Sequence, residues 1–161
     1  MTHTRKIHFA YKVLIIALAL NGLLFVYNYL FRYAAVETVL NGDTLLLGNG
    51  TVVELIGVDV PEADYSEERV RRFGLAAADF TQNMVEGKKV RIKYHHQNNT
   101  DGRVLASVYL MDGTFLNAEI IKQGYGRADS ACASGEVEEF QEYERQAREN
   151  KRGAWAEMPE W

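Results

Sequence analysis

The sequence predicts an α+β, mainly β fold: a five-stranded barrel with three helices, preceded by one apolar N-terminal helix. Three patterns indicate this fold. Short apolar or β-branched runs alternate with turn residues, amphipathic helical periodicities separate or follow these runs, and one long run near the N-terminus carries no charge. With 161 residues, 47% of them apolar and only two prolines, the chain has room for one packed domain and an accessory segment.

The accessory segment is residues 13–31, "VLIIALALNGLLFVYNYLF", which is about as long as a helix that crosses a bilayer. Three basic residues precede this run and Arg32 follows it, so the positive-inside rule predicts a single-pass transmembrane anchor at 13–32 with residues 1–12 in the cytoplasm. The alternative is a cleaved signal sequence and a secreted domain, because small residues follow the run in "RYAAVE". The run is longer than the ~7–15 apolar residues of a signal peptide, which favours the anchor.

Charge is divided unequally along the chain. All 22 acidic residues follow the apolar run, but only 14 of the 18 basic residues lie beyond Arg32, so the domain after the anchor has a net charge near −8. This balance argues against tight, non-specific binding of nucleic acid, for which Lys and Arg supply most of the affinity. It is compatible with a site whose positive charge is a bound metal.

Three short strands are predicted at residues 36–40, 44–47 and 52–58. Each is apolar or β-branched, and the turn sequences "NGD" and "GNG" separate them. A meander of three neighbouring strands is the simplest arrangement. An amphipathic helix is then expected from near Ser66 to Gly87, because apolar side chains recur at helical spacing at Phe73, Ala77, Phe80 and Met84.

The second half of the chain completes the barrel. Strands are predicted at 89–94 and 104–110 on either side of a polar loop, followed by a short helix at 115–123. A last helix starts near Val137 and is expected to carry Lys151 and Arg152 in its final turn. Five strands with helices after the third and fifth are compatible with a small Greek-key barrel of the oligonucleotide/oligosaccharide-binding kind, the OB-fold.

Four acidic residues lie in residues 41–62, "NGDTLLLGNGTVVELIGVDVPE". Taken singly, the motifs indicate only turns. "NGDT" is typical of a tight turn in which Asn41 and Gly42 have positive φ, and "DVPE" is typical of a proline-initiated turn after a strand. Only the order and spacing of the acids along the chain give them a further meaning.

That order resembles the staphylococcal nuclease (thermonuclease) family. "NGDT" is similar to the family's Asp-Gly-Asp-Thr, "VVELIGVDVPE" to its strand ending in Asp-x-Pro-Glu, and "TDGRVLASVYL" to its Gly-Arg loop before the fifth strand. The similarity continues through "FGLAAADFTQNMVEGKKVRI", "LNAEIIKQGYG" and "YERQARENKRGAW", and extends over about residues 36–155. It implies the same OB barrel with three helices, as a nuclease domain at 36–156 with a tail at 157–161.

The resemblance also implies a Ca²⁺ site and two catalytic groups. It assigns Asp43, Asp59 and the main-chain carbonyl of Val60 as ligands of the cation, and such oxygen ligands suit a hard ion. Glu62 would act as the general base for the attacking water. Arg103 would bind the phosphate and stabilise the charge that develops on its oxygens.

Glu54 departs from the family pattern, because it stands where the resemblance implies a second catalytic arginine. A missing charged donor typically costs ~10²–10³ in rate, and a carboxylate also repels a phosphodiester. Glu54 could instead provide one more oxygen ligand for the metal. We therefore expect a weakened catalytic site.

The sequence as a whole predicts a membrane-anchored, extracytoplasmic thermonuclease-like protein: a Ca²⁺-dependent phosphodiesterase or endonuclease that hydrolyses DNA or RNA. Its folded domain is expected to be a soluble monomer when the anchor is removed. Two alternatives remain open. One is an inactive OB-fold module that binds nucleic acid or Ca²⁺ without turnover, and the other is a membrane-tethered domain whose acidic surface binds a basic protein.

Overall fold

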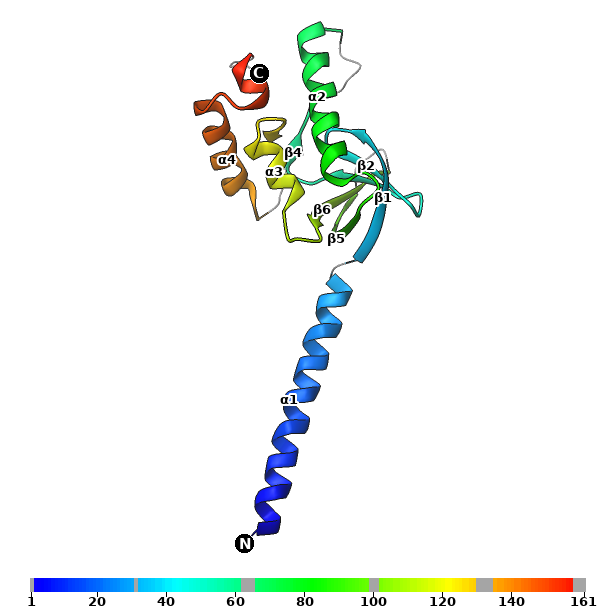
Figure 1. Cartoon of the computed structure of the whole chain (residues 1–161), viewed down its shortest axis with the longest axis vertical. Helices are drawn as coiled ribbons and strands as arrows, with labels where there is room; N and C mark the ends of the chain where they lie inside the picture. The colour runs from blue at the N-terminus through cyan, green and yellow to red at the C-terminus, as the bar shows by residue number, and fades with distance from the viewer. Residues whose placement is uncertain (1, 31, 62–65, 99–101, 130–134, 158–161) are drawn as a thin grey trace. The chain divides into compact units, whose positions relative to one another are not determined.

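The computed structural model describes residues 2–30, 32–61, 66–98, 102–129 and 135–157 (Figure 1). The chain separates into two compact units, Met1–Arg32 and Tyr33–Trp161. The first unit is the helix α1 (Thr2–Leu30), which exposes large apolar side chains such as Leu14, Ile16 and Leu23. Within the described ranges, no helix combines the length and the hydropathy that are needed to cross a bilayer. The anchor at 13–32 therefore stays a prediction.

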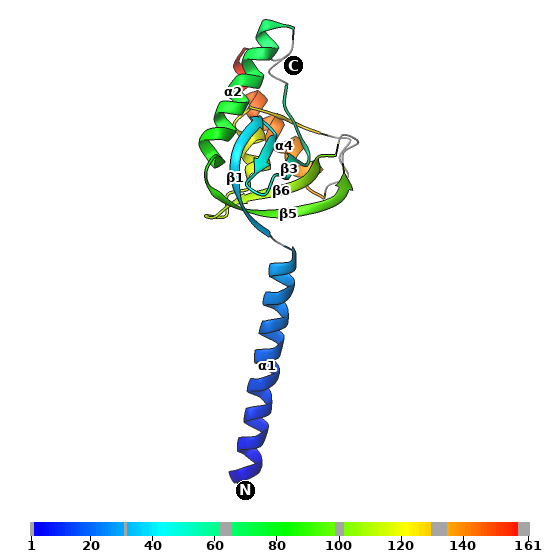
Figure 2. The ribbon, with the colours of Figure 1, turned by 90° about the vertical axis from the view of Figure 1, so that its right-hand side faces the viewer.

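The second unit is built on a closed five-stranded barrel, as predicted (Figure 2). The strand order is β1-β2-β3-β6-β5. The bounds are β1 (Arg32–Asn41), β2 (Thr44–Leu47), β3 (Val52–Leu55), β5 (Lys89–Asn98) and β6 (Val104–Leu110). Strands β1 to β3 form the expected antiparallel meander, and β5 and β6 pair antiparallel. The barrel is completed by a parallel pairing of β3 with β6.

The strand predicted at 52–58 is wrong in one respect, because it is two strands. The chain turns at Ile56 and Gly57, and Gly57 has a φ of 78°, which favours glycine. The two residues that follow form β4 (Val58–Asp59), which leaves the barrel and pairs antiparallel with β7 (Arg127–Ala128). This second, two-stranded sheet was not predicted, and it places Asp59 opposite Arg127.

Three helices pack on the barrel, as predicted, so that the described residues contain four α-helices with α1. They are α2 (Glu68–Val85), α3 (Leu116–Lys122) and α4 (Val137–Glu149). Helices α3 and α4 lie side by side (Figure 1), and α4 also packs against β7. Helix α4 ends earlier than predicted: Lys151 has a φ of 50°, so it and Arg152 follow the helix rather than lie in its last turn.

A buried amide fixes the point at which the chain leaves the barrel. The side chain of Asn117 on α3 is fully buried, and its Oδ1 accepts a hydrogen bond of 3.0 Å from the backbone N–H of Val108. Its Nδ2 donates to the carbonyls of Ile56 at 3.0 Å and Ala106 at 3.1 Å. Buried backbone groups need hydrogen-bond partners. The side chain of Asn117 is a partner for three of them, including the carbonyl of Ile56 just before the turn at Gly57.

Candidate active site

The first candidate acid, Asp43, lies in the short turn between β1 and β2. Neither Asn41 nor Gly42 in this turn has a positive φ, so the turn geometry expected from "NGDT" is wrong. Glycine is required at position 42 for space instead. An added Cβ would lie 2.7 Å from the Cβ of Ala77 on α2 and 2.7 Å from Cγ1 of Val60.

Helix α2 holds this turn through a buried hydrogen bond. The hydroxyl of Thr81 donates to the carbonyl oxygen of Gly42 at 2.6 Å. From the other side, the backbone N–H of Leu55 donates to the carbonyl of Asp43 at 2.8 Å. The backbone of Asp43 is therefore fixed between α2 and β3 before any ligand is present.

Asp43 is an acid in an unfavourable environment. Its side chain is 9% exposed and accepts a hydrogen bond of 2.8 Å from the Thr44 hydroxyl. The pKa of Asp43 is raised to about 6, chiefly by burial and also by the negative charges of Glu54 and Asp59, against the lowering effect of that hydrogen bond. The charges of Glu54 and Asp59 thus lie close enough to Asp43 to disfavour its ionised form.

Glu54 lies beside Asp43 because of strand register. On β3 it is opposite Thr44 of β2 and level with Leu105 of β6. Arg103 lies one residue before β6, and its Nη1 is 3.3 Å from Oε2 of Glu54. Both side chains are partly exposed. The arginine that is predicted to bind phosphate is therefore paired with the acid that departs from the family pattern.

Asp59 is paired with an arginine that the sequence did not single out. The register of β4 and β7 sets Asp59 opposite Arg127, and Nη2 of Arg127 lies 2.5 Å from Oδ2 of Asp59. The side chain of Asp59 is 49% exposed and that of Arg127 is 38% exposed. The partners are 68 residues apart in the sequence. The pairing of two-residue strands gives no periodic signal, so sequence reasoning missed Arg127.

The remaining predicted site residues are placed less completely. The side chain of Val60 is buried in the core, next to Gly42. Glu62, the predicted general base, lies outside the described residues. Among the residues described, no three side chains of His, Cys, Asp or Glu come together as metal ligands. The buried carboxylate of Asp43, on which the negative charges of Glu54 and Asp59 act, has the chemistry of a ligand for a hard divalent cation.

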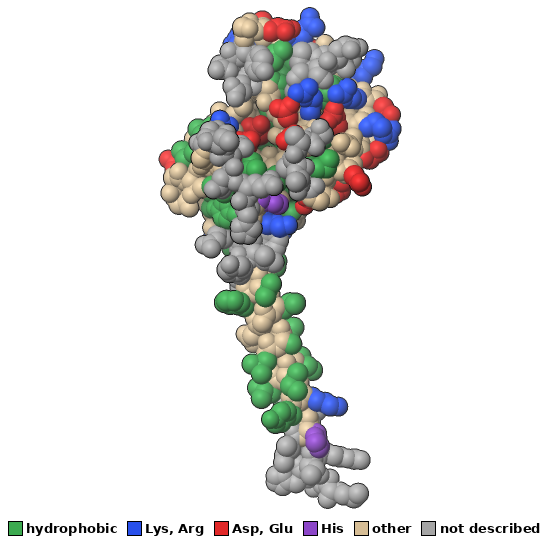
Figure 3. All heavy atoms as spheres, turned by 180° about the vertical axis from the view of Figure 1, so that it is seen from behind, with side chains coloured by type: hydrophobic (Ala, Val, Ile, Leu, Met, Phe, Trp, Pro, Cys, Tyr) green, Lys and Arg blue, Asp and Glu red, His purple; other side chains and the backbone are tan. Residues whose placement is uncertain are grey.

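One face of the second unit has mixed charge. On the face seen in Figure 3, acidic and basic side chains are interspersed over the second unit, and the described residues form no continuous basic track there. A strand of nucleic acid would therefore meet particular guanidinium groups rather than a broad positive field.

Comparisons with known proteins agree with this architecture. Residues 52–157 match the model of the family described as "Staphylococcal nuclease homologue", a stretch that includes β3 to α4 but begins after Asp43. The chain is 37% identical over 97 residues to a thermonuclease of Staphylococcus intermedius, which covers 58% of this chain and 57% of that protein.

Two further relatives match over longer stretches. The chain is 32% identical over 123 residues to a thermonuclease of Staphylococcus hyicus, covering 73% of this chain and 72% of that protein. It is 27% identical over 135 residues to an uncharacterized endonuclease of Escherichia coli, covering 80% and 82%, respectively. The family match spans well over half of the chain and coincides with the closed barrel and its helices. The chain therefore belongs to the family of staphylococcal nuclease homologues.

Proposed function

We propose that this chain is a nuclease that hydrolyses phosphodiester bonds of DNA or RNA with the help of a divalent cation, Ca²⁺ in the first instance. Its membership of the staphylococcal nuclease homologues and its similarity to two thermonucleases support this proposal. The match covers just over half of the Staphylococcus intermedius protein, so the activity and the substrate are proposals for this chain and are not taken over from that relative.

The observation that carries the proposal is the buried carboxylate of Asp43. Its pKa of about 6 indicates that the folded chain holds this group at a cost, with two more acids nearby. A structural acid would be expected to have a cationic partner. A cation ligand has this arrangement because the charge of the ion offsets the repulsion between carboxylates.

Each residue of the site then has a chemical role. Asp43, Asp59 and the main-chain carbonyl of Val60 would hold the cation. When bound, the cation neutralises the phosphate charge and polarises the P–O bond. Arg103 would bind a phosphate oxygen through its planar guanidinium and stabilise the developing charge. Glu62 would orient the attacking water and accept its proton.

The pairing of Glu54 with Arg103 limits this activity. A phosphate must compete with the carboxylate of Glu54, 3.3 Å away, for the same guanidinium. We propose that Glu54 thereby lowers the rate of hydrolysis. The same contact favours a second candidate function, an OB-fold module that binds nucleic acid or Ca²⁺ without turnover.

The initial rate of hydrolysis of labelled single-stranded DNA and RNA tests the proposal. The full-length chain is assayed at low salt with Ca²⁺ and with a chelator, and Asp43→Ala and Arg103→Ala are compared with the wild type. Cleavage that requires Ca²⁺ and falls at least ~10²-fold in Arg103→Ala supports the nuclease. Binding of Ca²⁺ or of the nucleic acid without cleavage supports the binding module instead.

We propose in addition that α1 attaches the chain to a membrane, with the domain at 36–156 on the extracytoplasmic side. The exposed apolar side chains of α1 and the basic residues near the N-terminus support this proposal. Protease added to cells stripped of their outer layers should remove the domain. Complete protection would contradict the orientation, and release of the domain into the medium would support signal cleavage.

A further inference from the structure

Arg127 is a guanidinium of the site that the proposed function does not use. We propose that Arg127 is a second phosphate-binding residue: it rests on Asp59 in the free protein and passes to a phosphate of the nucleic acid when Asp59 is engaged by the cation. This inference rests on the proposed function, because it requires Asp59 to be a cation ligand. It adds a substrate contact on β7, outside the barrel.

The backbone that carries Arg127 is fixed by close packing. Gly126 lies so near to the core that an added Cβ would be 3.0 Å from Cγ1 of Val58 and 3.1 Å from Cγ2 of Ile120. After β7, the backbone N–H of Asp129 donates to the carbonyl of Gly57 at 3.0 Å. These contacts, together with the β4–β7 pairing, hold the Cα of Arg127 beside Asp59.

Helix α4 supports β7 from the other side. The backbone N–H of Ala128 donates to Oε2 of Glu144 at 2.8 Å. Glu144 is itself held by Arg148, whose Nη2 lies 2.7 Å from its Oε1. The side chain of Glu144 is largely buried. The backbone that carries Arg127 is therefore fixed from both faces, as expected for a residue whose side chain must reach one particular point.

In contrast, the side chain of Arg127 can move at low cost. Its ion pair with Asp59 is about half exposed, and exposed ion pairs contribute little to stability. A guanidinium forms strong bidentate hydrogen bonds with phosphate oxygens as well as with carboxylates. We therefore expect the guanidinium to exchange the carboxylate of Asp59 for a phosphate by a rotation of the side chain, with the backbone unchanged.

The two arginines of the site differ in what their partners do. Arg103 is paired with Glu54, which is not one of the proposed cation ligands, so cation binding leaves that pair intact. Arg127 is paired with Asp59, which is a proposed ligand. The cation and Arg127 thus compete for one carboxylate. Binding of the cation withdraws the carboxylate of Asp59 from Arg127 and makes those N–H donors accessible to the phosphate, and this links the two binding events.

The test removes the carboxylate for which the cation and Arg127 compete, and it needs no metal. The substitution Asp59→Asn removes the carboxylate that is paired with Arg127 in the free protein. Binding of a fluorescein-labelled single-stranded DNA of about twelve nucleotides is then measured by anisotropy over a NaCl series with chelator present. We expect Asp59→Asn to bind several-fold more tightly than the wild type. The slope of log K against log salt should steepen by about 0.7, the value for one added phosphate contact on a single strand.

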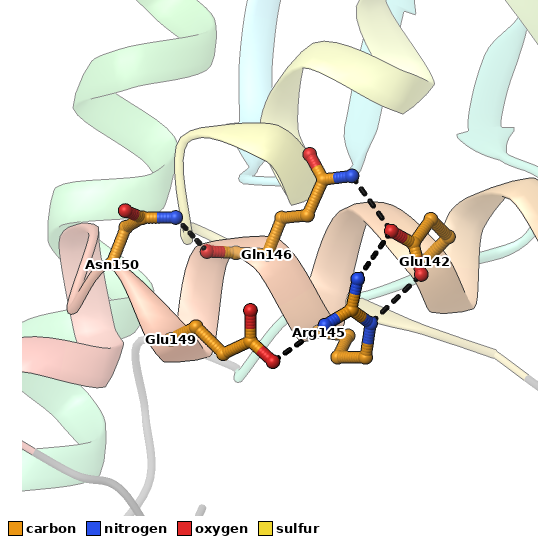
Figure 4. A network of polar contacts seen from close by, with 5 residues as sticks. All are labelled: Glu142, Arg145, Gln146, Glu149 and Asn150. Atoms are coloured by element: carbon orange, nitrogen blue, oxygen red, sulfur yellow. Dashed lines mark hydrogen bonds and ion pairs between the residues drawn. The ribbon is translucent and has the colours of Figure 1, made fainter.

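The control must distinguish the effect of the Arg127 side chain from the effect of the change in net charge. Asp59→Asn/Arg127→Gln and Asp59→Asn/Arg145→Gln have the same net charge, but Arg145 lies on the outer face of α4 among Glu142 and Glu149 (Figure 4). The first variant should lose the gain in affinity and slope, and the second should keep both. Equal behaviour of the two double variants would overturn the inference.

A kinetic measurement distinguishes failure of this inference from failure of the proposed function. With Ca²⁺, Arg127→Gln should lower kcat/KM by about 10² and Arg127→Lys by less, while Arg145→Gln stays at the wild-type value. A wild type that neither binds nor cleaves DNA overturns the proposed function and this inference together. A wild type that cleaves DNA and an Arg127→Gln variant with the same kcat/KM and salt slope overturn the inference alone.

Discussion

Replacing Asp43 with Asn should stabilise the metal-free protein at neutral pH. The substitution keeps the size of the side chain and an oxygen that can accept the 2.8 Å hydrogen bond from Thr44. It removes a charge that burial and two neighbouring acids disfavour. The pKa of Asp43 rises from 3.8 to about 6 in the folded chain, and at ~1.4 kcal/mol per unit the ionised form costs about 3 kcal/mol.

The pH dependence of this gain has a definite sign. A pKa that is raised by folding means that the folded chain binds the proton more tightly than the unfolded chain. The contribution of Asp43 to stability is therefore fully present below pH 3.8 and is lost as the pH rises through about 6. Asp43→Asn should match the wild type near pH 3.5 and exceed it by up to about 3 kcal/mol above pH 7.

Urea unfolding followed by circular dichroism measures this difference on the full-length chain, with chelator present, at pH 3.5 and 7.5. Asp112→Asn is a control of opposite sign, because hydrogen bonds from Thr114 lower the pKa of Asp112 on the surface. That variant should gain nothing at pH 7.5. If the free energy of unfolding of Asp43→Asn rises equally at both pH values, or does not rise at pH 7.5, then Asp43 is not the buried, destabilising charge that this reasoning assumes. Addition of Ca²⁺ should stabilise the wild type and not Asp43→Asn.

Four other outcomes are expected. Glu54→Arg should raise Ca²⁺-dependent cleavage of single-stranded DNA by ~10²–10³, because it removes the carboxylate that is paired with Arg103 and adds a guanidinium. Arg103→Ala in that background should remove the gain, and an inactive Glu54→Arg would instead assign Glu54 a required role. Asn117→Leu should lower the free energy of unfolding by about 2 kcal/mol or more, since it leaves the buried N–H of Val108 and the carbonyl of Ile56 without this partner, while the carbonyl of Ala106 keeps the N–H of Ile56; an unchanged urea midpoint would contradict that account. Gly42→Ala should cost about 1–3 kcal/mol in the same assay, because its Cβ would lie 2.7 Å from two side-chain carbons. Gly135→Ala, where no atom lies within 4 Å of the new Cβ and φ is likewise not positive, is the control without a steric clash. A fragment that starts at Tyr33 should fold as a soluble monomer, which size-exclusion chromatography with light scattering would check. A fragment that is insoluble without the N-terminal helix would contradict the division of the chain into two units at Arg32 and Tyr33.

The sequence by itself determined the elements that depend on neighbouring residues. Alternating or apolar runs between turn residues located β2 and β6 to the residue, and the meander of β1 to β3 followed from the short turns between them. Helical periodicity located α2, α3 and α4 within a few residues. These signals are local, because hydrogen bonds of a helix and of a hairpin join residues that are close in sequence. The order of the motifs was enough to indicate the family.

Only the tertiary structure decided which charges meet. Glu54 and Arg103 are 49 residues apart, Asp59 and Arg127 are 68 apart, and each pair depends on how distant strands align. Because the third predicted strand is interrupted at Gly57, Asp59 leaves the barrel and pairs with β7. A shift of one residue in either register would point these side chains to opposite faces. The site is thus set by closure of the barrel and by the β4–β7 pairing, which bring side chains together that no local pattern in the sequence connects.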